Sequence, residues 1–303
     1  MPTGQNRRKA IKNILLSTAA IGGTSLLSSN IAVEKKTVTD KTIEPALKGN
    51  VNHSVCRWTF NDLSVEELCK AVKEIGFAAI DLAGPKDWPV MQQHGVFSSM
   101  CNGAEINLTD GFAEKNYHAQ LIKNYLELIP LVAKNGYKNL ICFSGSRRGM
   151  DNETGWKNAA EGLKQIISLA EKHKVVIVME LLNSKIDHKD YMCDRTAWGV
   201  ELCKRVGSEN FKLLYDIYHM QIDEGDVIRN IRDNHQYIGH YHTGGVPGRH
   251  EIDESQELYY PAIIKAIMAT GFNDYVAQEF IPTGKDNTAR LAALKDAVKR
   301  CDV

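Results

Sequence analysis

Short apolar segments that recur along this 303-residue chain, each ending in a polar residue, constrain its fold most strongly. Four such segments end at or near Glu180, Asp216, His242 and Glu279, which are spaced by 36, 26 and 37 residues. This spacing fits a repeated unit of strand, loop and helix in which all strands run in the same direction. If the strands close into a barrel, their carboxyl ends meet at one mouth and bring the four side chains together.

Candidate strands and helices alternate from residue 51 onward. Ser64 and Glu67 form a capping box that predicts the start of a helix, and Gly76 predicts its end. Eight strands and about eight helices in alternation favour a single-domain (β/α)8 TIM barrel. A doubly wound open sheet is the alternative, but no GxGxxG motif follows the first strand. The predicted strands are 54–60, 77–83, 95–103, 137–145, 175–180, 212–216, 237–242 and 274–279.

The chemistry of the four strand-end residues indicates a divalent metal. Carboxylates that are crowded into one pocket repel one another unless a cation lies between them. Three carboxylates and one imidazole suit Mg²⁺ or Mn²⁺, and they are also compatible with Co²⁺ or Zn²⁺. We therefore expect a metal-dependent enzyme whose ligands are Glu180, Asp216, His242 and Glu279. His240 lies on the same side of its strand as His242 and is expected to be a hydrogen-bonded neighbour of the ligands.

Charge and cysteine content narrow the choice of partners. Lys+Arg and Asp+Glu number 37 each, so the chain lacks the basic excess that is typical of nucleic-acid-binding proteins. The seven cysteines form no CxxC pair, which argues against structural zinc and against a disulfide scaffold. We expect a small-molecule substrate and no nucleic acid. The sequence leaves the number of subunits open, a homo-oligomer included.

The amino terminus has the features of an export signal. Arg7 and Arg8 precede an apolar stretch at 14–27, and small or neutral residues follow at 28–32. The arginine pair resembles a twin-arginine signal, with an ordinary secretory peptide as the alternative. The stretch falls short of a permanent membrane anchor, so we expect an exported, periplasmic protein with no stable membrane insertion once the signal is removed. The expected parts are a signal peptide at 1–32, a linker at 33–50 and the barrel at 51–303.

Four segments of the chain resemble the xylose isomerase-like TIM barrel family, and within it hydroxypyruvate isomerases and ketose 3-epimerases. The segments are VVIVMELLN, LLYDIYHMQ, IGHYHTGGVPGRHEID and YVAQEF, and the likeness covers about residues 51–303. The resemblance implies that Glu180 and Glu279 bind the metal and also exchange protons with the substrate. Asp216 and His242 match the remaining ligands of the family.

The same resemblance implies two substrate contacts. His219 matches a histidine three residues past the metal aspartate, and Arg249 matches the arginine of the VPGR loop. These side chains would hold a carboxylate or hydroxyl of the substrate. The alternatives are that Arg249 only pins its own loop and that His219 bonds a backbone carbonyl.

Other polar and aromatic residues near the strand ends carry weaker expectations. Arg147 and Arg148 follow the fourth strand and are candidates for an anionic substrate, or belong to a solvated loop. Trp58 and Trp88 are candidates for the walls of a pocket, or are core residues.

The predicted activity is the isomerisation of a small hydroxy-carbonyl compound, similar to that of hydroxypyruvate isomerases, with proton transfer through an enediolate. His242 favours an alternative, because hydroxypyruvate isomerases usually have glutamine at this ligand and ketose 3-epimerases have histidine. A metal-dependent lyase or hydrolase on the same barrel is a further alternative. A sugar-binding protein without activity would be expected to lack one of the two glutamates, and both are present.

Overall fold

The structure, a computed structural model, describes residues 46–303. The predicted signal peptide at 1–32 and all but the last five residues of the predicted linker at 33–50 lie outside these residues. The described residues belong to one compact unit. None of its helices is long and apolar enough to cross a membrane.

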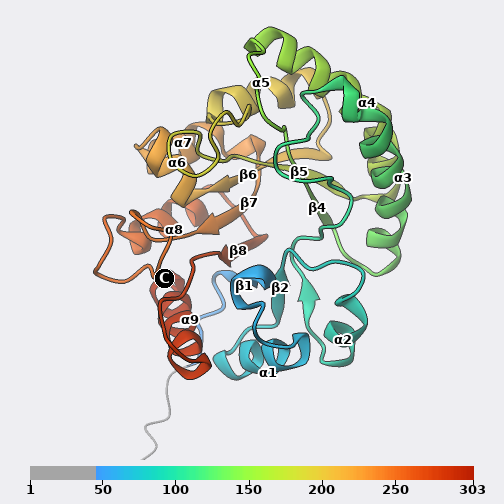
Figure 1. Ribbon diagram of the computed structural model, residues 1–303. Coiled ribbons are helices and arrows are strands. Elements are labelled where there is room, and N and C mark those ends of the chain that lie inside the picture. The colour runs from blue at the N-terminus through green and yellow to red at the C-terminus, as the bar shows by residue number, and fades with distance from the viewer. Residues whose placement is uncertain (1–45) are drawn as a thin grey trace, which may run out of the picture. The chain divides into compact units, whose positions relative to one another are not determined.

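Eight strands form the centre of this unit (Figure 1). They are β1 (Asn52–Cys56), β2 (Ala79–Asp81), β3 (Phe97–Ser98), β4 (Asn139–Cys142), β5 (Val176–Glu180), β6 (Phe211–Asp216), β7 (Ile238–Thr243) and β8 (Tyr275–Gln278). Their order in the sheet is β3-β2-β1-β8-β7-β6-β5-β4, and all the pairings are parallel. The predicted TIM barrel is confirmed.

The barrel closes between β3 and β4 through a single residue, Cys101. The backbone N–H of Cys101 donates to the carbonyl of Asn139 at 2.8 Å, and the N–H of Ile141 donates to the carbonyl of Cys101 at 3.0 Å. The side-chain amide of Asn139 donates to the carbonyl of Ser99 at 3.0 Å. This buried amide adds a side-chain hydrogen bond to the two backbone bonds that close the barrel.

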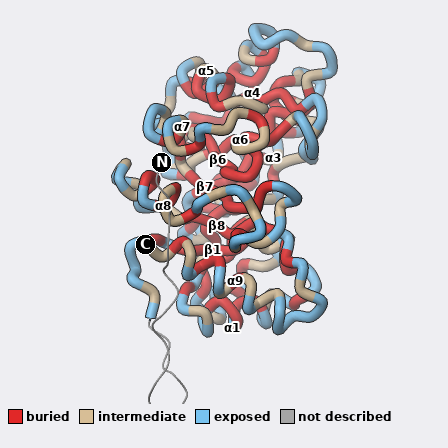
Figure 2. The backbone as a smooth tube through the Cα atoms, turned by 90° about the vertical axis from the view of Figure 1, so that its left-hand side faces the viewer, coloured by how far each residue is buried: buried red, intermediate tan, exposed pale blue. Residues whose placement is uncertain are grey.

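Helices surround the barrel, and their inner sides are buried against the strands (Figure 2). Most follow a strand in the manner of a β-loop-α unit. They are α1 (Val65–Ile75), α2 (Trp88–Gln93), α3 (His118–Lys134), α4 (Asn152–His173), α5 (Thr196–Val206), α6 (Ile217–Asp223), α7 (Val227–Asn234), α8 (Tyr260–Ala269) and α9 (Asn287–Cys301).

The predicted capping box at the start of α1 is confirmed. The Ser64 hydroxyl accepts from the backbone N–H of Glu67 at 3.2 Å, and the Glu67 carboxylate accepts from the backbone N–H of Ser64 at 2.8 Å. The helix ends at Gly76, whose φ of 117° lies in the left-handed region that glycine adopts without strain.

Three local features differ from what the sequence predicted. The strand predicted at 54–60 ends at Cys56, because the chain turns into a 3-10 helix at Arg57–Phe60. A further helix, α6, follows β6 directly and ends before Gly225, whose φ is 67°, and this helix was not predicted. The short helix α2 was not predicted at all, because six residues are too few for a helical period to be recognised.

Replacing Asn139 tests the closure of the barrel. Asn139→Ala leaves the buried carbonyl of Ser99 without this donor, so we expect a loss of roughly 1–3 kcal/mol in the free energy of unfolding. Urea denaturation measures it. The control is Asn287→Ala on the exposed start of α9, which should change stability by less than about 0.5 kcal/mol. Equal effects of the two substitutions would contradict the assigned role of Asn139.

Candidate functional site

The structure brings Glu180, Asp216, His242 and Glu279 together at the carboxyl ends of β5 to β8. One potential ligand atom from each lies within 4.8 Å of those of the other three. The four side chains, here called the four-residue cluster, are buried, with exposed fractions of 0 to 3%. Their convergence follows from the parallel register, in which Asp216 on β6 stands beside His242 on β7.

Burial and neighbouring charges shift the pKa values of the three carboxyl groups in this cluster in different directions. Burial and the neighbouring Glu279 raise the pKa of Glu180, and burial raises the pKa of Asp216 well above its usual range. Burial alone would also raise the pKa of Glu279, but Arg249 and His242 outweigh it and hold that pKa well below the usual value. Glu180 Oε1 is buried without a hydrogen-bond partner among the described residues. A buried carboxylate oxygen without a hydrogen bond is costly, and a bound cation would offset that cost.

Arg249 reaches the cluster from the loop after β7. Its Nη2 donates to Glu279 Oε2 at 2.5 Å and lies 3.4 Å from Asp216 Oδ2. The guanidinium lies between the rings of Trp58 and Tyr218, at 5.1 and 5.5 Å from their centroids. Arg249 therefore does not only stabilise its own loop, because its positive charge also pairs with two carboxylates of the cluster.

His219 is buried beside the cluster at the start of α6. Its Nε2 lies 3.5 Å from Asp216 Oδ2 and has no hydrogen-bond partner among the described residues. Its Nδ1 lies 2.7 Å from the side-chain amide of Asn183, which can donate to it. This arrangement differs from the alternative of a bond to a backbone carbonyl, and it leaves Nε2 as the nitrogen that faces the carboxylates.

Asp81 is a member of this site that sequence reasoning missed. It ends β2, and its Oδ1 lies 2.9 Å from His242 Nε2 while its Oδ2 lies 2.8 Å from His240 Nε2. Burial alone would raise the pKa of Asp81, but His240 and His242 hold it well below its usual range. Asp81 lies two residues before the end of the predicted strand 77–83, whereas the observed strand ends at Asp81, so the overlong predicted strand hid its strand-end position. His240 packs against the expected ligand His242, with ring centroids 5.3 Å apart, and contacts Asp81 rather than the ligands themselves.

The two tryptophans have different positions. Trp58, which is 37% exposed, donates from Nε1 to Glu279 Oε1 at 2.8 Å and so borders the four-residue cluster. Trp88 is buried at the start of α2, where its Nε1 donates to the carbonyl of Ala83 at 2.9 Å. Trp88 is therefore a core residue.

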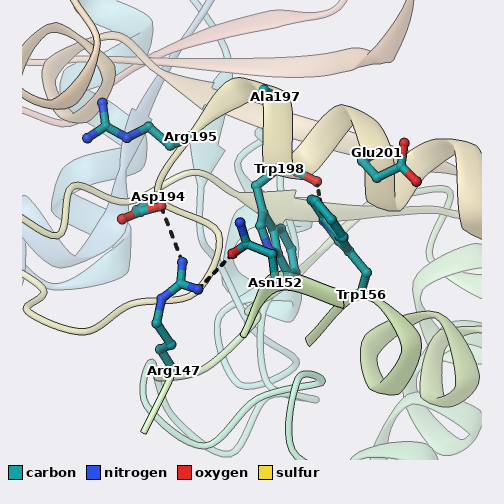
Figure 3. A pocket seen from close by; sticks show the side chains of 8 residues that line it. All are labelled: Arg147, Asn152, Trp156, Asp194, Arg195, Ala197, Trp198 and Glu201. Carbon is teal, nitrogen blue, oxygen red and sulfur yellow. Dashed lines mark hydrogen bonds and ion pairs between the residues drawn. The ribbon is translucent and has the colours of Figure 1, made fainter. Parts of the chain in front are cut away.

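Arg147 lines a separate pocket of about 470 Å³ at the starts of α4 and α5 (Figure 3). There it donates to Asn152 Oδ1 at 2.7 Å and lies 3.9 Å from an oxygen of Asp194. The neighbouring Arg148 binds Asp110 at 2.5 Å. The structure thus places both arginines outside the four-residue cluster. The residues lining the pocket are Arg147, Asn152, Trp156, Asp194, Arg195, Ala197, Trp198 and Glu201.

Solved structures of other proteins share this fold. A family 2 AP endonuclease from Brucella melitensis aligns with a TM-score of 0.72 at 24% identity, over 80% of this chain and 96% of that one. A D-psicose 3-epimerase from Clostridium cellulolyticum, solved with D-tagatose, aligns with a TM-score of 0.68 at 17% identity, over 83% of this chain and 98% of that one. At these identities the likeness concerns the fold alone.

Curated relatives match part of the chain at higher identity. A 2-oxo-tetronate isomerase from Cupriavidus necator is 34% identical over 46% of this chain and 53% of its own length. A putative hydroxypyruvate isomerase from Homo sapiens is 29% identical over 41% of this chain and 45% of its own length. The chain thus spans about half the length of these relatives. The model of the family described as xylose isomerase-like TIM barrel matches residues 48–300.

Removing the charge of Arg249 tests the electrostatic balance of the cluster. Arg249→Met keeps much of the side-chain volume but leaves two buried carboxylates without their cation, so we expect a loss of roughly 3–5 kcal/mol in unfolding free energy. Urea denaturation in the presence of a chelator measures it. Arg229→Met, which breaks an exposed pair with Asp226, should cost less than about 1 kcal/mol. Similar losses for both variants would contradict this account.

Proposed function

The chain belongs to the xylose isomerase-like TIM barrel family, and we propose that it is a metal-dependent isomerase of a small hydroxy-carbonyl compound. The observation that carries this proposal is the convergence of two buried glutamates, Glu180 and Glu279, with Asp216 and His242. The names of the relatives support the reaction class, since they include isomerases and a D-psicose 3-epimerase.

The four-residue cluster fits a divalent cation. Three carboxylates and one imidazole, all buried and within 4.8 Å of one another, match the donor set of Mg²⁺ or Mn²⁺ and are compatible with Co²⁺ or Zn²⁺. Glu180 Oε1 supports this fit, because it accepts no hydrogen bond from the described residues and a buried carboxylate oxygen without one is costly. When bound, the ion would stabilise the negative charge that develops on two oxygens of the substrate.

Glu180 and Glu279 are the proposed acid and base. One takes the proton from the carbon next to the carbonyl of the substrate, and the other returns it to the neighbouring carbon, so the substrate passes through an enediolate. Arg249 and Trp58 fix the carboxylate of Glu279 with hydrogen bonds of 2.5 and 2.8 Å. A fixed base needs less reorganisation before it takes a proton.

His219 and Arg249 are the proposed substrate-binding residues. His219 offers an Nε2 that has no hydrogen-bond partner among the described residues, and this nitrogen faces the cluster. Arg249 offers a guanidinium that lies beside two of the carboxylates. A planar guanidinium suits a substrate carboxylate or a pair of oxygens.

Hydroxypyruvate is the first substrate to test, and a ketose that is epimerised at C3 is the second. The hydroxypyruvate and 2-oxo-tetronate isomerases among the relatives support the first. The imidazole of His242 supports the second, as does a D-psicose 3-epimerase that is 28% identical over 50% of this chain and 51% of its own length.

Proton exchange in deuterated water tests the reaction and the roles of the glutamates. We expect deuterium at C3 of hydroxypyruvate and at C2 of its aldehyde isomer, or at C3 of a ketose. Glu180→Gln and Glu279→Gln should each slow exchange by about 10²–10⁴-fold, because each removes one proton-transferring group. The matched control Glu257→Gln lies outside the cluster and should exchange at the wild-type rate. Mass spectrometry of the substrate reads the label.

The absence of exchange in metal-loaded wild-type protein, with every substrate of the panel, would refute the isomerase proposal and favour a lyase or hydrolase. Wild-type rates in both glutamine variants would refute the assigned acid and base while leaving the reaction class in place.

We also propose that the chain is exported to the periplasm by a twin-arginine-like signal, on the basis of Arg7 and Arg8. Arg7→Lys together with Arg8→Lys should hold the chain in the cytoplasm, as measured by cell fractionation and immunoblotting. Export that persists in this variant would indicate an ordinary secretory peptide, which needs positive charge but no arginine pair.

A further inference from the structure

Asp81 makes a contact across the interior of the barrel that the proposed reaction does not use. It belongs to β2, whereas His242 belongs to β7, and β1 and β8 lie between these strands in the sheet. Asp81 Oδ1 nevertheless lies 2.9 Å from His242 Nε2. Neither side chain has measurable exposure.

We propose that Asp81 is a positioning residue for the cation site: it accepts a hydrogen bond from Nε2 of His242 and so directs Nδ1 of the same ring toward Glu180 and Glu279. This inference rests on the proposed function, because it assigns Asp81 a task at the same cluster. Nδ1 of His242 lies 2.8 Å from Glu279 Oε2 and 3.5 Å from Glu180 Oε1.

The two nitrogens of an imidazole have complementary roles. When Nε2 carries the proton and donates it to a carboxylate, Nδ1 keeps its lone pair and can bind a cation. A carboxylate behind a ligating histidine both fixes the orientation of the ring and raises the basicity of the ligand. In His242 the nitrogen that faces Glu180 and Glu279 is Nδ1, and the nitrogen that faces Asp81 is Nε2.

Asp81 is itself held rigidly. Its Oδ2 accepts from the hydroxyl of Ser99 at 2.6 Å and lies 2.8 Å from His240 Nε2, while its Oδ1 contacts His242 and the thiol of Cys56. Its backbone pairs with Cys56 of β1 in the sheet. A carboxylate on a strand, with both oxygens in contact with neighbours, can hold a ring more tightly than a group on a loop.

Metal affinity separates positioning from a general structural role. In calorimetric titration with Mn²⁺, the wild-type chain should bind one ion, and Asp81→Asn should bind it about 10–100-fold more weakly. The control Ser99→Ala removes a hydrogen bond from the other oxygen of the same carboxylate. It should lower the melting temperature but leave the affinity for Mn²⁺ within about threefold of wild type.

Two outcomes would overturn the positioning role alone. One is an unchanged affinity in Asp81→Asn, or a loss no larger than in Ser99→Ala. The other is two ions per wild-type chain, since Asp81, His240 and His242 could themselves hold a cation and Asp81 would then be a ligand. A wild-type chain that binds no ion would instead overturn the proposed function.

If Asp81→Asn does not fold, the wild-type chain still provides a test. With ¹⁵N-labelled histidine, NMR of the Mg²⁺-loaded protein should find the proton of His242 on Nε2 and none on Nδ1. A proton on Nδ1 would contradict the proposal, because that nitrogen could not then face the ion as a ligand.

Discussion

The mutual repulsion of three buried carboxylates is the constraint on which the rest of this site depends. Two like charges about 4 Å apart repel by about 4 kcal/mol at an effective dielectric constant near 20, and burial adds a cost for each charge. Glu180, Asp216 and Glu279 meet within 4.8 Å in the mouth of the barrel, and among the described residues Arg249 is the one arginine or lysine that pairs with them. A divalent cation relieves this repulsion, which links the stability of the site to its proposed chemistry.

The barrel can hold such a cluster because rigid strands supply its members. Glu180 and Asp216 end β5 and β6, and His242 lies within β7, so the parallel hydrogen bonds of the sheet fix the relative positions of these side chains. The guanidinium of Arg249, which pairs with Asp216 and Glu279, packs over the rings of Trp58 and Tyr218. The fold thus preorganises the residues proposed as acid, base and cation ligands, and an enzyme that stabilises developing charge depends on such preorganisation.

The sequence predicted correctly the features that depend on a periodic pattern or on residues close together in the chain. The alternation of strands and helices, the strand-end positions of the four-residue cluster and the capping box at Ser64 all depend on residues near one another in the chain. The contact between Asp81 and His242 joins strands that are not neighbours in the sheet, so no local pattern encodes it. Helix α6 was also missed, because its seven residues follow β6 directly and are too few for a helical period to be recognised.

Anomalous diffraction from crystals grown with Mn²⁺ tests the central claim most directly. We expect one peak inside the mouth of the barrel, within about 2.0–2.6 Å of one atom from each of Glu180, Asp216, His242 and Glu279. A cluster without a peak in fully loaded crystals, or an ion that binds elsewhere while these four side chains remain paired only with Arg249 and with one another, would contradict the account.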